Sequence, residues 1–222
     1  MIVIDIESSG LNLAKNGIWQ IGAIDLDTGE EFFEEAKIDD EDEIMKEALV
    51  LTGKTEQDLR DKTKQSQKQL IENFLNWVEK FDERILAGHN VGFDVMFIQN
   101  KCIEYNLREK FHKITGQRSI DLHTLANIIY MKKNKKFKKS ENGKSSMNLS
   151  SVLEFCGLKD KRMAMSNGEV IKEGKPHDAL EDSKLEAECF SRLVYGKNLL
   201  PEFKKDPVPE YLEQNPVMGE DK

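Results

Sequence analysis

The sequence predicts an α/β domain built around a mixed sheet. Three observations carry this prediction: a short apolar run at the start, a pair of strands around a tight turn, and helical patterns that alternate with short strands afterwards. With 222 residues, of which 38% are hydrophobic and 33% charged, the chain has the composition of a soluble globular protein. It is long enough to bury one substantial core.

The sheet is expected to begin with the first residues. Residues 2–6 (IVIDI) are apolar and rich in β-branched side chains, which is typical of a central strand covered on both faces. Residues 19–26 and 31–38 flank a short turn that contains Gly29, a pattern that favours an antiparallel hairpin. Two further short strands are expected, at residues 84–87 and 119–121.

The helices follow from apolar residues at helical spacing. A first helical segment is expected to end at Gly53, with Thr55 as the N-cap of the next turn. The longer helical patterns that follow cover residues 66–81, 93–107, 122–131, 149–155 and 179–194.

The composition changes after residue 196. Four of the five prolines lie between Pro201 and Pro216, so residues 197–222 are expected to be extended, partly disordered or wrapped on the surface. We therefore expect one domain, residues 1–196, followed by a proline-rich C-terminal tail, residues 197–222.

Several classes of protein are disfavoured. No apolar run approaches the roughly 18 residues that cross a bilayer, and the start lacks the basic residues of a secretory signal. Cys102, Cys156 and Cys189 are scattered, so neither a disulfide framework nor a zinc site is indicated. We expect a cytoplasmic protein with no membrane association.

Two acidic residues stand at the end of the first strand. Asp5 and Glu7 are two residues apart, so both side chains leave the same face of the sheet. The C-terminal end of such a strand is where open α/β sheets place ligands, and carboxylate oxygens suit Mg²⁺ or Mn²⁺. Taken alone, the pair is better explained as two solvated acids at the end of a strand.

Two further motifs contain acids at helix starts. Asp94, in GHNVGFD, lies in the first turn of a helix, where the helix dipole favours an acid without any chemistry. In PHDALED, Asp178 and Glu181 resemble a capping box. This arrangement leaves His177 just outside the helix and Asp182 one turn inside it, so that His177 could swing over a site built by Asp182, or could be a surface residue.

The three motifs in order, D-I-E-S-S-G-L, H-N-V-G-F-D and H-D-A-L-E-D, resemble those of the DEDDh-type 3′→5′ exonucleases, which include the proofreading epsilon subunit of bacterial DNA polymerase III. The resemblance covers about residues 1–195 and includes the segments WQIGAI, EALVLTGKTEQDL and NLSSVLEFCGL. Asp178, where the tyrosine subgroup has Tyr, places the chain with the histidine subgroup. The resemblance implies a ribonuclease H-like fold, with a five-stranded mixed sheet that has one antiparallel strand and is flanked by helices.

The resemblance also implies roles for the motif residues. The metal ligands would be Asp5, Glu7, Asp94 and Asp182, holding two divalent cations, Mg²⁺ or Mn²⁺. His177 would take a proton from the attacking water, which suits a side chain that titrates near neutral pH. Two ions about 4 Å apart stabilise both the attacking and the leaving oxygen of such a reaction.

Contacts to the substrate are implied as well. Ser8, Ser9, Gly10 and Leu11 would hold the terminal nucleotide, with Leu11 against its base. The opposite wall would be formed by His89, Asn90 and Phe93, although Phe93 could equally be a core residue.

Two positions depart from the family pattern. Ser8 and Ser9 stand where many relatives have threonines, a change that keeps both hydroxyls. Gln20 stands where relatives often have Glu, and the lost charge could alter metal affinity or rate. Asp121, by contrast, is better interpreted as a helix N-cap than as a ligand.

The net charge of −8 is unusual for a protein that binds nucleic acid. The charge is unevenly placed, however: residues 132–139 read KKNKKFKK, and Lys144 follows closely. This lysine-rich loop could grip the backbone of an incoming strand, or it could be a solvated loop, and the sequence favours neither.

The sequence therefore predicts a 3′→5′ exonuclease that hydrolyses single-stranded DNA to nucleoside 5′-monophosphates, in proofreading or repair. The expected partners are a single-stranded 3′ end, DNA rather than RNA, and a polymerase or repair assembly. One alternative is an exoribonuclease, because no residue decides how a 2′-hydroxyl is received. The other is a catalytically silent binding module, which the filled motif positions disfavour.

Overall fold

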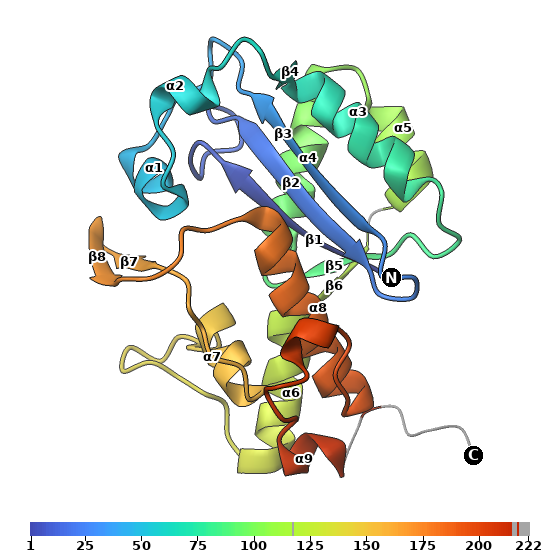
Figure 1. Cartoon of the computed structure of the whole chain (residues 1–222), viewed down its shortest axis with the longest axis vertical. Helices are drawn as coiled ribbons and strands as arrows, with labels where there is room; N and C mark the ends of the chain where they lie inside the picture. Colours follow the sequence, from blue (N-terminus) through green and yellow to red (C-terminus); the bar gives the residue numbers. More distant parts are fainter. Residues whose placement is uncertain (117, 215–216, 218–222) are drawn as a thin grey trace.

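The structure, a computed structural model, describes residues 1–116, 118–214 and 217. Its centre is a mixed six-stranded sheet with the strand order β4-β3-β2-β1-β5-β6 (Figure 1). The strands are β1 (Ile2–Ser8), β2 (Ile18–Asp25), β3 (Glu31–Lys37), β4 (Gln65–Ser66), β5 (Leu86–Gly88) and β6 (Ser119–Asp121).

Strand β2 alone runs against its neighbours in this sheet. It pairs antiparallel with both β1 and β3, whereas β1 with β5, β5 with β6 and β3 with β4 are parallel pairs. The predicted mixed α/β sheet with one antiparallel strand is therefore confirmed. It gains a sixth strand, β4, whose two residues are too short to give a periodic pattern.

The alternation of side chains along β1 separates two cores. Ile2, Ile4 and Ile6 point into a cluster shared with α3 (Gln67–Val78), α4 (Gly92–Glu104) and α5 (Arg108–Thr115). Val3 faces the opposite cluster, shared with α6 (Leu122–Asn134), α7 (Leu149–Phe155) and α8 (Ala179–Tyr195). Because side chains alternate along a strand, Asp5 and Glu7 leave β1 on the same side as Val3, the side covered by α8.

Polar caps fix where several helices begin. Thr55 forms a capping box with Asp58 at the start of α2 (Glu56–Leu59), which follows α1 (Lys46–Thr52). Asp121 accepts the backbone N–H of Thr124 at 3.2 Å and so caps α6. Each of the three predicted caps, at Thr55, Asp121 and Asp178, is confirmed.

Further elements were not predicted. Helix α5 was missed because only a few of its side chains are apolar, among them the buried Phe111 and Ile114. The small hairpin of β7 (Ala164–Ser166) and β8 (Glu169–Lys172) is mostly exposed and lacks the alternation of a half-buried strand. Its turn, Asn167-Gly168, has positive φ at both residues, and this Asn-Gly pair was the available sequence signal.

The proline-rich segment wraps around the end of α8. It contains a 3-10 turn, η1 (Pro201–Phe203), and a short helix, α9 (Glu210–Glu213). Leu200 and Leu212 are buried in the same core as α8. Of the three expectations for this segment, wrapping describes residues 197–214; residues 215–216 and 218–222 lie outside the described residues.

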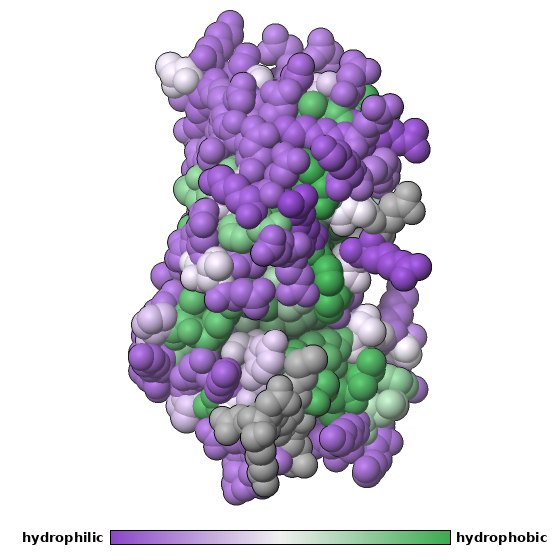
Figure 2. Space-filling model, turned by 90° about the vertical axis from the view of Figure 1, so that its right-hand side faces the viewer, coloured by the Kyte–Doolittle hydropathy of each residue, from purple (hydrophilic) through white to green (hydrophobic). Residues whose placement is uncertain are grey.

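Across the described ranges, no helix combines the length and the apolar character that a bilayer crossing requires. Figure 2 shows that one side of the molecule is mainly hydrophilic in its upper half. Hydrophobic side chains gather lower down on that side, at the level where Figure 1 places α6, α8 and α9.

Candidate active site

Three elements bring five acidic side chains to one place beside β1. Asp5 and Glu7 come from the strand itself, and Asp94 comes from the first turn of α4. Asp182 and Glu186 lie one turn apart on the face of α8 that covers β1. The carboxylate of Asp94 accepts the backbone N–H of Ile6 at 3.2 Å, which joins the start of α4 to the strand.

Helix α8 is seated directly on β2. A side chain at Gly22 would overlap the backbone of Ala179 and Leu180, so only glycine allows this approach. The hydroxyl of Ser183 donates to the carbonyl of Gly22 at 2.9 Å. This close seat fixes the first turn of α8, and with it the position of Asp182.

Gln20 fastens the same helix start. Its side-chain oxygen accepts the backbone N–H of Ala179 at 2.8 Å, and its amide nitrogen donates to Asp178 and to Glu35, each at 3.2 Å. A carboxylate cannot donate, so a glutamate at this position would face two other carboxylates. The amide therefore fits the neighbours that this chain provides.

The acidic side chains strongly perturb one another. Burial, together with the neighbouring carboxylates, holds the pKa of Asp5, Glu7 and Glu186 well above the usual range. Burial is also the main cause that raises the pKa of Asp94 to about 7, against the hydrogen bond from Ile6 that lowers it. The cluster thus holds more negative charge than its own surroundings stabilise.

Arg162 provides positive charge at this cluster. Its Nη1 lies 3.1 Å from Oδ2 of Asp182, and its Nε lies 3.0 Å from Oδ1 of Asp160. Burial raises the pKa of Asp182, and the Arg162 guanidinium opposes that rise. Arg162 precedes β7 in a segment for which no motif had predicted a functional residue.

His177 stands at the entrance to α8. Its ring Nε2 lies 2.9 Å from the carbonyl oxygen of Met163, and its Nδ1 lies 3.4 Å from Oδ2 of Asp182. A carbonyl can only accept, so Nε2 donates and Nδ1 is the nitrogen that faces the cluster. The backbone N–H of His177 donates to the carbonyl of Leu51 at 2.9 Å, which ties this segment to α1.

The donor set suits a hard divalent cation. Glu7, His177 and Asp182 each offer a ligand atom, and these atoms all lie within 4.8 Å of one another. Asp5 and Asp94 are close enough for their charges to act on each other and on Asp182 or Glu7. The carboxylate oxygens of this set are donors of the kind that hard divalent cations prefer.

The four residues of the loop after β1 that were expected to contact the substrate differ in their exposure. Ser9 is buried, and its hydroxyl donates to the carbonyl of Glu43 at 2.6 Å, while a Cβ at Gly10 would lie 2.6 Å from Oδ1 of Asn16. The hydroxyl of Ser8 donates to the carbonyl of Gly10 at 2.7 Å. Leu11 is 73% exposed and alone of the four presents a large apolar surface to solvent.

The turn between β5 and α4 holds the other expected contacts. The backbone N–H of His89 donates to Glu186 at 2.9 Å, and the His89 ring nitrogen Nε2 bonds the carbonyl of Met147 at 3.0 Å. Burial is the main cause that lowers the pKa of His89. Asn90 has a positive φ of 58°, and Phe93 packs edge to face on Phe97, within the first core.

Two residues of this site were missed from the sequence, Arg162 and Glu186. Glu186 had a usable signal, because it lies four residues after Asp182 and therefore on the same face of the helix. Arg162 lies in an irregular segment, so only the folded chain brings it to Asp182.

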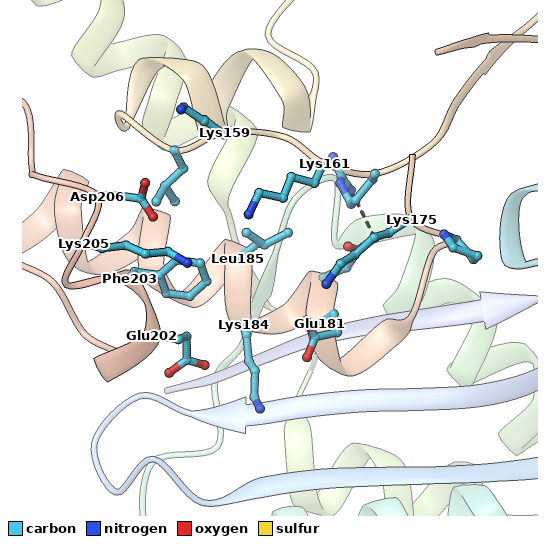
Figure 3. A pocket seen from close by; sticks show the side chains of 14 residues that line it. Lys159, Lys161, Lys175, Glu181, Lys184, Leu185, Glu202, Phe203, Lys205 and Asp206 are labelled. Atoms are coloured by element: carbon cyan, nitrogen blue, oxygen red, sulfur yellow. Dashed lines mark hydrogen bonds and ion pairs between the residues drawn. The ribbon is translucent and has the colours of Figure 1, made fainter. Parts of the chain in front are cut away.

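Arg162 and Asp182 also line a cavity of about 540 Å³. Figure 3 shows Lys159, Lys161, Lys175 and Lys205 around it, with the carboxylates of Glu181, Glu202 and Asp206 among them. The lining is therefore of mixed charge.

The fold and the acidic cluster define a protein of the nuclease class. A sequence model of the exonuclease family RNase_T matches residues 2–190. The match covers most of the chain, which therefore belongs to this exonuclease family. The membership predicted from the three motifs, among 3′→5′ exonucleases of the DEDDh type, is confirmed.

Individual relatives are more distant. The chain is 27% identical over 131 residues to the PolC-type DNA polymerase III of Pediococcus pentosaceus, a match that covers 58% of this chain and 8% of the polymerase. It is similar to E. coli exonuclease I in complex with a dT13 oligonucleotide, with a TM-score of 0.64 and 18% identity over 86% of this chain and 40% of that one. An exonuclease I from Methylocaldum szegediense gives a TM-score of 0.62 and 19% identity, over 88% and 41% of the two chains. These structural matches show the fold, and the chain spans less than half of each relative.

Proposed function

We propose that the protein is a metal-dependent 3′→5′ exonuclease that hydrolyses single-stranded DNA and releases nucleoside 5′-monophosphates. The observation that carries this proposal is the cluster of Asp5, Glu7, Asp94 and Asp182, which occupies the motif positions of an exonuclease family in one group, with Asp94 and Asp182 buried and Asp5 and Glu7 half-buried. Its excess of negative charge calls for bound cations.

We assign Asp5, Glu7, Asp94 and Asp182 as ligands of two divalent cations, Mg²⁺ or Mn²⁺. When bound, such ions supply Lewis-acid stabilisation to the attacking and leaving oxygens. The carboxylates would orient the ions and neutralise their charge, and because the pKa values of these carboxyl groups are raised, metal binding would release protons.

His177 is the proposed base. In the proposed step the oxygen of water forms a bond to phosphorus, the water proton passes to the imidazole, the bond from phosphorus to the 3′ oxygen breaks, and the released 3′ oxygen takes a proton from solvent. With Nε2 donating to Met163, the ring nitrogen free to accept is Nδ1, and Asp182 would stabilise the imidazolium that forms. Release from the Met163 carbonyl would let the ring turn toward the substrate.

The substrate end of the site is formed by the loop after β1 and the start of α4. Leu11, which is exposed, would pack on the terminal base, and Ser8, His89 and Asn90 would surround the sugar and phosphate. Ser9 and Gly10 hold the loop, and Phe93 supports the wall from the core.

DNA is preferred to RNA because the related exonuclease I was solved with a dT13 oligonucleotide and the related polymerase is a DNA polymerase. We also propose that residues 1–196 form the exonuclease domain, that residues 197–222 are a C-terminal extension of it, and that the protein acts in the cytoplasm. A polymerase or repair assembly would be a partner. An exoribonuclease with the same catalytic residues is the second candidate.

The test uses single-stranded DNA and RNA of equal sequence, labelled at either end, with Mg²⁺, Mn²⁺ or EDTA. We expect a ladder from the 5′-labelled DNA, immediate release of mononucleotide from the 3′-labelled DNA, and no reaction in EDTA. Faster loss of RNA would replace the DNA assignment with the exoribonuclease one. No hydrolysis of either polymer by folded protein would contradict the enzyme and leave a binding module.

A further inference from the structure

The lysine-rich loop is the most basic part of this acidic chain. Residues 132–145 contain seven lysines and one glutamate, whereas the whole chain carries a net charge of −8. Lys132 and Lys133 lie in the last turn of α6, and the other five lysines belong to the loop that follows. Among the described residues, the ion pair that these lysines form is Lys138 with Glu154, at 3.5 Å. Lys133 lies over the ring of Tyr211, 4.0 Å from its centroid. Most of the positive charge therefore faces solvent without a counter-charge.

The loop is folded against α6. The backbone N–H of Ser140 donates to the carbonyl of Lys144 at 2.9 Å, and that of Ser146 donates to the carbonyl of Lys138 at 3.1 Å. The hydroxyl of Ser145 lies 2.9 Å from the ring Nε2 of His123 in the first turn of α6. These hydrogen bonds give the loop a defined conformation against α6, so its lysines are held in fixed positions.

A cavity of about 390 Å³ opens between this loop and α6. Its wall contains two apolar side chains that water reaches, Ile128 with 54% and Phe137 with 49% of the side chain exposed. Lys138 and Lys139 line the same cavity, and within the described residues no carboxylate does. An aromatic face among lysines is the combination by which proteins bind single-stranded nucleic acid without reading its sequence.

The cavity is connected to the acidic cluster by two packed rings. His123, which lines the cavity, meets the ring of His89 edge to face, with centroids 5.9 Å apart. The backbone of His89 in turn donates to Glu186 of the cluster. A strand whose last nucleotide lies at the cluster therefore has the cavity within reach of its next nucleotides.

We propose that this cavity and the lysine-rich loop bind the single-stranded DNA that precedes the 3′-terminal nucleotide. In this arrangement, which rests on the proposed function, Phe137 and Ile128 contact bases while Lys138 and Lys139 contact phosphates. The larger cavity beside Arg162 fits a strand less well, because Glu181, Glu202 and Asp206 stand among its lysines and would repel phosphate (Figure 3).

The test separates binding of the strand from the chemical step. Three proteins are compared: the wild type, Phe137→Ala with Lys138→Gln and Lys139→Gln, and a control with Lys159→Gln and Lys205→Gln from the other cavity. Each is given a labelled 20-nucleotide single-stranded DNA, with Ca²⁺ present, to measure Kd by fluorescence anisotropy at several salt concentrations. Each is also given the p-nitrophenyl ester of thymidine 5′-monophosphate with Mg²⁺, a substrate that has no preceding strand.

We expect the triple variant to bind the 20-mer at least about tenfold more weakly, since one base–aromatic contact alone is worth about 1–3 kcal/mol. The slope of log Kd against log salt should fall by about 1.4, because two phosphate contacts are lost. The kcat/KM for the ester should equal that of the wild type, and the control should bind as the wild type does.

Equal Kd and salt slope in the wild type and the triple variant would overturn the inference, as would a loss confined to the control. A wild type that binds DNA but cleaves neither substrate would contradict the proposed function alone, because the anisotropy measurement needs no hydrolysis.

Discussion

The guanidinium of Arg162 forms an ion pair with the carboxylate of Asp182 in the acidic cluster, with Nη1 3.1 Å from Oδ2. Arg162 belongs to none of the three motifs, yet it neutralises Asp182, which belongs to the third. A cation bound by Asp182 would compete with Arg162 for the same oxygen, so the ion pair links metal binding to the segment before β7.

Arg162→Ala should make the metal-free protein less stable and more responsive to metal. Loss of one partner of a buried ion pair costs about 3–5 kcal/mol, and in this case the partner left behind is one of several carboxylates. The melting temperature without metal should fall, and the rise on adding Mg²⁺ should exceed that of the wild type. Arg162→Lys, which keeps the charge, is the control. Equal rises in all three proteins would show that the arginine and the metal do not share Asp182.

The free energy of unfolding of the metal-free protein should fall as pH rises from about 4 to about 7. The pKa of Asp94 is about 7 in the folded protein and 3.8 in an ordinary environment, so over this interval the folded state binds the proton and the unfolded state does not. The free energy of unfolding therefore increases as the pH falls toward 3.8, the pKa of the aspartate in the unfolded chain. Asp94→Asn keeps the oxygen that accepts from Ile6 but cannot titrate. Urea unfolding at several pH values should give a shallower slope for this variant, and an identical slope would contradict the assignment.

Glu186 and Glu188 should respond in opposite ways to neutralisation. Both are buried on α8, but Glu186 faces the other carboxylates, whose repulsion helps to raise its pKa. Glu188 instead accepts from Arg192 at 2.8 Å and from the backbone of Leu199 and Leu200.

Glu186→Gln should therefore raise the melting temperature of the metal-free protein at pH 8. Glu188→Gln should lower it, by a loss of about 3–5 kcal/mol of stability, because a buried charge loses its partner. The two variants are a matched pair, because each replaces a buried glutamate of α8 with glutamine. Shifts of the same sign would show that the acidic cluster is not under electrostatic strain.

Gln20→Glu should destabilise the protein by about 1–3 kcal/mol, the cost of an unpaired buried polar group. The substitution keeps an oxygen for Ala179 but removes the donor that meets Asp178 and Glu35. Chemical denaturation measures the loss. Gln69→Glu, at an exposed position of α3, is the control and should change little. A neutral or stabilising effect of Gln20→Glu would mean that the departure at this position has no structural cause.

Local patterns predicted most of the fold because its central elements are regular. The period of two in β1 was enough to place Asp5 and Glu7 on one face, and the first turn of α8 was marked by Asp178. Strand β4 has two residues and α5 is largely polar, so neither gives a periodic signal.

The candidate site was only partly predictable, for a different reason. Asp5, Glu7 and Asp182 stand on regular elements, whose direction follows from spacing. Arg162 depends on the path of an irregular segment, and Ser9 turns inward to Glu43 although a loop serine carries no sign of its direction. Such contacts are decided by tertiary packing.

The role of the acidic cluster as the catalytic centre is tested by a time course of 5′-labelled single-stranded DNA with Mg²⁺, using the wild type, Asp5→Asn and, as an exposed acidic control, Asp27→Asn. We expect stepwise shortening from the 3′ end by the wild type and by Asp27→Asn. We expect Asp5→Asn to shorten the DNA at least about a hundredfold more slowly, because stabilisation of the transition state is removed. Equal rates in Asp5→Asn and the wild type, with both proteins folded, would contradict the assignment of this acidic cluster as the catalytic centre.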